Sequence, residues 1–180
     1  MSARIAPQPA PFAPAIQARL DAIMPPGVAP LTLFTTLARD ERLFARFMDG
    51  GLLDKGHLTM REREIVIHRI CGLNRAAYEW GVHAALFAPH VGLDGAQLAA
   101  TVTGAQAGWT PKEALLMDFC AAVNATAEVD DALWARLRAD FSEMACLELI
   151  LLAGFYRTVS LLVNALRLPL EPNSVPFPSE

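Results

Sequence analysis

Two pairs of acid–base side chains stand out in segment 61–90 of this 180-residue sequence. Glu64 and His68 lie four residues apart. The same spacing separates Glu79 from His83. Residues four apart in an α-helix share a face, so each pair places a carboxylate beside an imidazole. Burial raises the pKa of a carboxyl group, and a neighbouring carboxylate raises the pKa of a histidine. The pattern therefore favours general acid–base chemistry near neutral pH.

A short turn at Gly72–Asn74 separates the two pairs, so we expect their helices to lie side by side. Both pairs could then meet between apolar helices, as titratable groups often do at functional sites. The alternative is that each pair is an ordinary surface pair, which stabilises a helix by about 0.2–0.5 kcal/mol. The spacing alone is consistent with either interpretation.

Cysteine chemistry is a second interpretation. Cys71 continues the face of Glu64 and His68 and could be an activated thiolate, but a thiol within an apolar helix is more often inert core. Cys120 and Cys146 are predicted to be core residues. The three cysteines form no C-x-x-C pair, which fits a reducing compartment and offers no dithiol redox cycle.

Metal binding is a third interpretation, and the spacing disfavours it. Di-iron bundles use Glu-x-x-His with additional glutamates, whereas both pairs here have the longer spacing. No H-E-x-x-H motif is present. We therefore predict no metal and no cofactor.

Tyr78 and Trp80 flank Glu79 and could line a pocket. Glu148 interrupts an apolar run and needs a cation, either Arg157 or an arginine of another helix.

Helix start and stop signals run through the sequence, while alternating strand patterns are nearly absent. Thr59 with Glu62, and Thr110 with Glu113, form capping boxes. Asn74, Asp94, Asp130 and Ser142 are further candidate N-caps. About eight helices are expected, over 14–24, 31–49, 60–72, 74–88, 95–103, from 110, 131–140 and 143–167. The fold class is therefore all-α.

Composition limits the possible partners. The chain is 53% hydrophobic and 19% charged, with a net charge of −4, so it can build a core and carries no basic field for nucleic acid or anionic membranes. The apolar stretch 149–166 contains Arg157, Ser160 and Asn164 and is interpreted as a buried or subunit-packing helix. We expect a cytoplasmic protein, because no secretion signal opens the sequence.

Proline-rich segments flank the helical part. We expect an N-terminal arm over 1–13, one helical domain over 14–168 and a C-terminal arm over 169–180. The arms could be frayed tails or could wrap a neighbouring subunit. Helices this apolar in a small domain favour burial against copies, so a homo-oligomer is expected.

The same segment resembles the carboxymuconolactone decarboxylase family, whose all-helical fold is that of AhpD-like proteins. The resemblance rests on Leu-Thr-Met-Arg-Glu-Arg-Glu-Ile-Val-Ile-His-Arg-Ile-Cys, on Asn-Arg-Ala-Ala-Tyr-Glu-Trp-Gly-Val-His, and on the tail motif Leu-Ile-Leu-Leu-Ala-Gly-Phe-Tyr. It covers roughly 30–172. The peroxidase branch uses a glutamate, a C-x-x-C and a histidine, which correspond here to Glu64, to Ala76 and Glu79, and to His83. Both cysteine positions lack a thiol.

The resemblance implies a lyase acting on a small carboxylated lactone or related acid. His83 would be the acid–base group, and Glu64 and Glu79 its partners. Arg75 or Arg69 could hold the substrate carboxylate through a bidentate contact. The resemblance also implies a dimer, trimer or hexamer. Two alternatives stay open, namely a peroxidase-like antioxidant (peroxiredoxin activity) that uses Cys71 as a lone thiol, and a non-catalytic binding or scaffold protein of the same fold.

Overall fold

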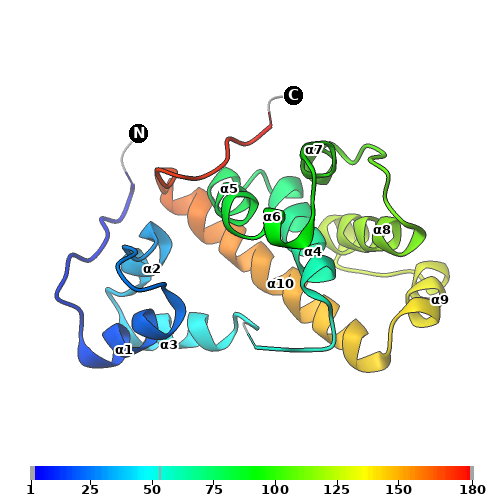
Figure 1. Ribbon diagram of the computed structural model, residues 1–180. Helices are drawn as coiled ribbons and strands as arrows, with labels where there is room; N and C mark the ends of the chain where they lie inside the picture. Colours follow the sequence, from blue (N-terminus) through cyan, green and yellow to red (C-terminus); the bar gives the residue numbers. More distant parts are fainter. Residues whose placement is uncertain (1–2, 53, 179–180) are drawn as a thin grey trace.

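The computed structural model describes residues 3–52 and 54–178, which contain ten α-helices and no strand. Figure 1 shows the longest helix running diagonally through the molecule, with the first three helices at one end and the eighth and ninth at the other. The helices are α1 (Pro14–Ile23), α2 (Thr32–Leu37), α3 (Glu41–Asp49), α4 (Met60–Leu73), α5 (Ala77–Leu86), α6 (Ala88–Val91), α7 (Gly95–Thr103), α8 (Pro111–Thr126), α9 (Asp131–Asp140) and α10 (Glu143–Leu166). The all-α prediction is confirmed, with slightly more helices than expected.

The predicted capping signals start five of the ten described helices. The boxes at Thr59 and Thr110 both form, and Asp94 forms a third box with Gln97. Asp130 and Ser142 cap α9 and α10 through their side chains. Each cap satisfies amides that have no partner within the helix, which fixes where the chain enters it.

Three predicted boundaries are wrong. The helix expected over 31–49 is broken, because the Asp40 side chain accepts from the Leu43 amide at 2.9 Å and starts α3 anew. Asn74 ends α4 instead of starting the next helix, and its side-chain amide donates to Ile70 O at 2.8 Å. The helix expected over 74–88 ends at Leu86, and Pro89 lies in the first turn of the short α6.

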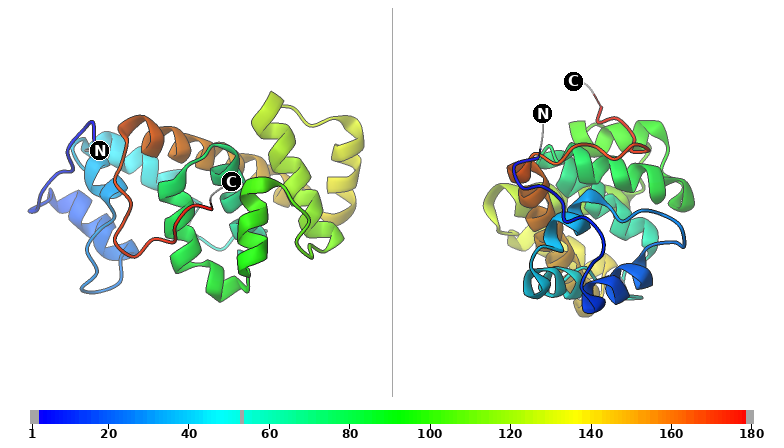
Figure 2. Two further views of the ribbon diagram at one scale, coloured as in Figure 1. Left: turned by 90° about the horizontal axis from the view of Figure 1, so that it is seen from above. Right: turned by 90° about the vertical axis from the view of Figure 1, so that its left-hand side faces the viewer.

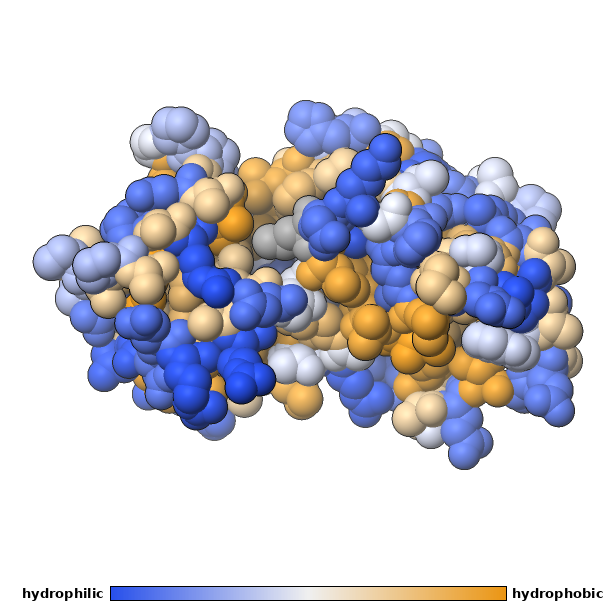
Figure 3. Space-filling model, turned by 90° about the horizontal axis from the view of Figure 1, so that it is seen from below, coloured by the Kyte–Doolittle hydropathy of each residue, from blue (hydrophilic) through white to orange (hydrophobic). Residues whose placement is uncertain are grey.

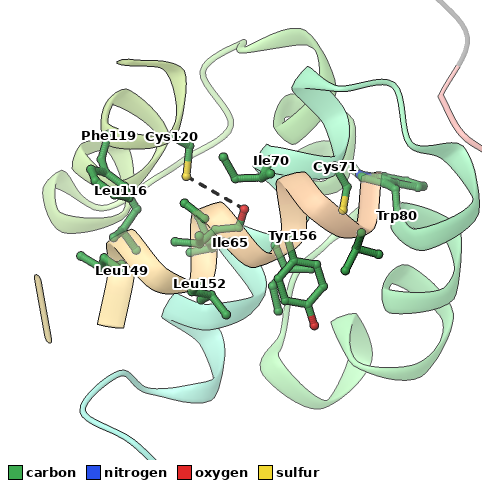
Figure 4. Packing of buried hydrophobic residues seen from close by; sticks show 14 of the residues in the cluster. Ile65, Ile70, Cys71, Trp80, Leu116, Phe119, Cys120, Leu149, Leu152 and Tyr156 are labelled. Atoms are coloured by element: carbon green, nitrogen blue, oxygen red, sulfur yellow. Dashed lines mark hydrogen bonds between the residues drawn. The ribbon is translucent and has the colours of Figure 1, made fainter. Parts of the chain in front are cut away.

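α4 is the centre of the main core. It packs against α5, α7, α8 and α10, and its residues 64–72 are all buried. Figure 4 shows side chains of α4, α8 and α10 interlocking, with Ile65, Leu116 and Leu149 among them. A smaller core joins α1 to α3 around Phe44. The acid–base segment is thus held in the most rigidly packed part of the molecule.

α10 is half buried in this fold, although its length and composition alone would allow it to cross a membrane. Glu148 on its buried side pairs with Arg63 of α4 at 3.2 Å, so an arginine of another helix is the partner, and Arg157 bonds to Asn124 O instead. Exposed apolar side chains gather on the underside of the molecule (Figure 3). The first half of α10 has four exposed apolar side chains, namely Met144, Leu147, Ile150 and Leu151. The homo-oligomer stays a prediction.

The described residues of the two proline-rich arms, 3–13 and 169–178, contain no helix and lie on their own chain. Figure 2 shows the C-terminal segment crossing over α5. There the Val175 amide donates to Gly81 O at 3.0 Å, and a Cβ on Gly81 would lie 2.5 Å from Val175 O. Glycine at this position therefore permits the close approach of the arm. At the other end, the Arg4 amide donates to Leu166 O at 2.8 Å.

Candidate functional site

Glu64 and His83 meet in the groove between α4 and α5, which the tight turn after α4 places side by side. Glu64 Oε2 lies 2.9 Å from His83 Nδ1, and both side chains are buried. The two predicted pairs therefore converge in one cluster. A carboxylate and an imidazole this close in an apolar setting form a strong, charge-assisted hydrogen bond.

The second nitrogen of His83 faces two further groups. Its Nε2 lies 3.2 Å from Tyr156 Oη of α10 and 3.4 Å from Glu79 Oε1. Glu79 Oε2 is buried and has no hydrogen-bond partner among the described residues. His83 is thus clamped between two carboxylates, while one carboxylate oxygen is left to accept a hydrogen from a bound molecule or water.

The charges of this cluster keep His83 protonated at neutral pH. Burial acts to lower the pKa of His83, but the charges and hydrogen bonds of Glu64 and Glu79 outweigh it and raise that pKa to about 10. Burial, followed by the charges of the same two glutamates, raises the pKa of Tyr156. Tyr156 therefore keeps its phenolic hydrogen, so it can accept from His83 Nε2–H and donate to a third group.

His68 lies behind this cluster and is fully buried. Its Nδ1 donates to the backbone oxygen of Glu64 at 2.7 Å, and the Glu64 carboxylate is 3.5 Å away. Burial and then the charge of His83 lower the pKa of His68 to about 4. The ring is therefore neutral, with the hydrogen on Nδ1, and its bare Nε2 has no partner in the described part of the chain. His68 orients Glu64 from behind and does not face the cavity.

His83, Glu79 and Tyr156 form one wall of a cavity of about 540 Å³. Its other described lining residues are mostly apolar and come from α1–α3 and the loops beside them, from the first residue of α4, from α5 and α6, and from α10. They are Ile23, Met24, Pro25, Leu31, Phe34, Phe47, Met48, Gly51, Met60, Val82, Leu86, Phe87, His90 and Phe155. None of these lining residues is a lysine or an arginine. The volume suits a small organic molecule with few charges.

Two of the predicted site residues, Cys71 and Trp80, lie in the core. Cys71 is fully buried beneath the Ser160 hydroxyl and does not line the cavity, and burial, reinforced by the charge of Glu79, raises its thiol pKa well above the usual value. Figure 4 shows Cys71 among core side chains, whereas the Tyr156 hydroxyl points away from them. Trp80 donates to Thr101 Oγ1 at 3.0 Å, on the side of α7. Cys71 and Trp80 are therefore packing residues.

Tyr78 belongs to the attachment of the C-terminal arm. Its hydroxyl donates to Glu171 and accepts from the Leu33 amide at 3.1 Å. Glu171 also accepts from the Thr32 amide at 2.6 Å. Tyr78 thus connects the arm to the start of α2 and does not line the cavity.

Neither arginine proposed for the substrate carboxylate lies at the cavity. Arg69 Nη1 donates to Thr101 O at 3.0 Å and to Val102 O at 3.3 Å, on another side of α4. Arg75 lies in the exposed turn after α4 with a φ of 53°, and it is not a lining residue. The structure gives neither arginine a place in the cavity wall, because α4 directs Arg69 towards α7 and Arg75 lies in the turn beyond the helix.

Tyr156 and His90 line the cavity and were not singled out from the sequence. The one signal for Tyr156 was a phenol within the otherwise apolar middle of α10, in the motif Gly-Phe-Tyr. Among the described residues, no three histidine, cysteine or carboxylate side chains are grouped as a metal ion would require. The arrangement is suited to proton transfer by protein groups.

Comparison with known proteins gives one partial family match and two solved structures of the same fold. Residues 41–119 match the model of the carboxymuconolactone decarboxylase family. A search of the curated proteins gives no significant match. A crystal structure from Ralstonia eutropha JMP134, described as an alkylhydroperoxidase AhpD core and an uncharacterized peroxidase-related protein, is 20% identical with a TM-score of 0.81, and 93% of each chain is covered. An uncharacterized peroxidase-related protein from Silicibacter sp. TM1040 is 18% identical with a TM-score of 0.82, covering 95% of this chain and 92% of the other. The expected fold is confirmed.

Proposed function

We propose that this chain, which carries a carboxymuconolactone decarboxylase family segment at residues 41–119 on an AhpD-like fold, is an acid–base enzyme acting on a small, largely apolar carbonyl compound of the lactone type. One observation carries the proposal. His83, Tyr156 and Glu79 line an apolar cavity, Glu64 binds His83 from behind, and Glu79 Oε2 has no partner among the described residues.

The proposed step moves one proton and one electron pair. Glu79 Oε2 accepts a proton from the carbon beside the lactone carbonyl, and the electron pair of that C–H bond moves onto the carbonyl oxygen. The Tyr156 hydroxyl donates a hydrogen bond to this oxygen, while the His83 imidazolium stabilises the new negative charge. Return of a proton to carbon completes an isomerisation or exchange. In a decarboxylation the C–C bond breaks instead, carbon dioxide leaves, and the same groups protonate the carbanion.

The cavity suits an uncharged substrate, whereas the family resemblance implies a lactone that carries a carboxylate. His83 is the cation closest to Glu79, and it is already shared by two carboxylates. A substrate carboxylate would enter an apolar cavity beside Glu79 without an arginine among the described lining residues to pair with it. Uncharged lactones are therefore the better-matched class, and a carboxylated lactone would bind weakly.

Deuterium exchange tests the step without knowledge of the natural product. A panel of uncharged and carboxylated γ-lactones is incubated in D2O, and NMR follows loss of the proton beside the carbonyl, with carbon dioxide release measured for carboxymuconolactone. Wild type should exchange an uncharged lactone, and His83→Gln or Glu79→Gln should slow it by roughly 10²–10⁴-fold. His57→Gln and Glu128→Gln are matched controls, because both side chains are exposed and neither lines the cavity.

The thiol alternative and the binder alternative give different results. Peroxide consumption that is lost in Cys71→Ser would contradict the proposal, whereas the buried position of Cys71 predicts no such loss. The cavity itself favours the second candidate, a non-catalytic binder of apolar molecules. Saturable lactone binding in wild type with neither exchange nor carbon dioxide release would establish that function instead.

A further inference from the structure

Arg69 is a buried cation without a carboxylate partner among the described residues. It is 9% exposed, and its Nη1 donates two hydrogen bonds to backbone oxygens at the end of α7. The α7 carbonyls supply only the partial negative charge of a helix C-terminus. A buried guanidinium is costly unless it is paired with an anion and all its donors are satisfied. Its Nε–H, however, has no partner.

A second orphaned donor lies at the same place. Arg69 and Trp109 both line a small pocket between α4, the loop after α7 and α8, and Trp109 Nε1 is also buried without a partner. Figure 1 shows the long connection between α7 and α8 that forms one side of this region. The pocket shares no lining residue with the cavity at His83. Its two unsatisfied groups are both donors, so it can be satisfied only by acceptor atoms.

The remaining walls suit a compact ligand. Gly104 has a φ of 79° and lets the backbone approach the guanidinium, since a Cβ there would lie 3.1 Å from Arg69 Nη2. Asp118 contributes a carboxylate to the wall, but it pairs with Arg136 at 3.0 Å and is largely exposed. The volume of about 90 Å³ holds several water molecules or one small planar ion.

We propose that this pocket binds a small carboxylate anion of formate or acetate size, through Arg69 Nε–H and the Trp109 indole N–H. The anion neutralises the buried guanidinium and accepts the two orphaned hydrogens. Water could satisfy the hydrogens, but it would leave the charge unpaired. The site differs from the acid–base cavity in position, charge and ligand, and it does not depend on the proposed activity.

The Trp109 indole N–H reports binding directly. The ¹⁵N-labelled full-length protein is titrated with sodium formate or acetate at constant ionic strength, which is maintained with a bulky sulfonate buffer anion that exceeds the pocket. The chain has three tryptophans, so Trp109→Phe assigns the resonance and Trp134→Phe is its matched control. Formate should shift the Trp109 indole signal along a saturating curve, and the sulfonate should leave it unmoved.

Two variants test the assignment of the site. Arg69→Gln removes the charge and should weaken formate binding by at least about tenfold. Ala121→Leu fills the pocket without changing the arginine, so it should abolish the shift even if Arg69→Gln fails to fold. Arg42→Gln, at an exposed arginine, should bind as wild type does. A Trp109 signal that formate and acetate leave unmoved, or that shifts equally with the sulfonate or in Ala121→Leu, would overturn the proposal.

Discussion

α4 separates two buried polar regions that lack opposite kinds of hydrogen-bond partner. On the side of α5, two glutamates surround one imidazolium, and the atoms left without partners are His68 Nε2 and Glu79 Oε2. On the side of α7 and α8, Arg69 meets only backbone oxygens, and the unpartnered atoms are its Nε and Trp109 Nε1. The unpartnered atoms of the first region are therefore acceptors, and those of the second are donors.

This difference shows how one helix can serve two kinds of ligand. A region with spare acceptors and a net negative charge selects protic or C–H-acidic neutral molecules, and it repels carboxylates. A region with spare donors and a positive charge selects anions. The two regions lie on different sides of α4 because side chains five residues apart point about 140° away from each other.

Glu64→Leu should have the largest effect on the first region. It removes the hydrogen-bond partner of His83 Nδ1 and leaves a buried imidazole between Glu79 and Tyr156. Breaking one partner of a buried ion pair costs about 3–5 kcal/mol in free energy of unfolding. Urea unfolding at pH 7 measures this loss. Glu128→Leu, at an exposed glutamate, is the control, and an equal change in both variants would contradict the role of Glu64.

The stability contributions of His83 and His68 should depend on pH in opposite directions. The pKa of His83 rises from 6.5 to about 10 on folding, so the stability it contributes is complete below pH 6.5 and is lost as the pH rises through 10. The pKa of His68 falls from 6.5 to about 4, so its contribution is present above pH 6.5 and is lost as the pH falls towards 4. Each pKa unit corresponds to about 1.4 kcal/mol.

The measurement is urea unfolding across pH 4–10 for wild type, His83→Gln and His68→Gln. The difference between wild type and His83→Gln should shrink between pH 6.5 and 10, and the difference for His68→Gln should shrink between pH 6.5 and 4. His57→Gln, at an exposed histidine, should show neither trend. Parallel curves for the two buried histidines would remove the distinction between them.

The features of this site that depend on residues close in sequence could be predicted, whereas those that depend on long-range contacts could not. Capping boxes and the spacing of Glu64 and His83 depend on neighbours along the chain, so they could be predicted. Tyr156 lies 73 residues from His83, and the cavity needs α1–α3 folded against α5 and α10, which no local pattern encodes. Arg69 was misassigned because proximity in sequence was given more weight than helical direction, which separates it from Glu64.

Arg69→Met should affect the second region by a smaller amount. It keeps much of the aliphatic packing and removes the guanidinium from Thr101 O and Val102 O. Hydrogen bonds to a charged group contribute about 1.5–3 kcal/mol, and loss of an unpaired buried charge offsets part of that. Calorimetry should therefore show a modest drop in melting temperature that is independent of pH between 6 and 9. A pH-dependent drop would mean that the two regions are coupled.

Tyr156→Phe should have the smallest effect on stability and still separate structure from chemistry. The ring stays packed on His83 and Phe155, and only the hydroxyl beside His83 Nε2 is lost, at a cost of about 1 kcal/mol. Tyr78→Phe is the matched control, since it loses two structural hydrogen bonds, to Glu171 and from Leu33, and leaves the cavity intact. Tyr156→Phe should therefore be the more stable variant and yet exchange the lactone roughly 10²-fold more slowly than wild type. Tyr78→Phe should be less stable and exchange it at a rate near that of wild type. If exchange followed stability in both variants, Tyr156 would be a packing residue, and the first region would donate no hydrogen to its ligand.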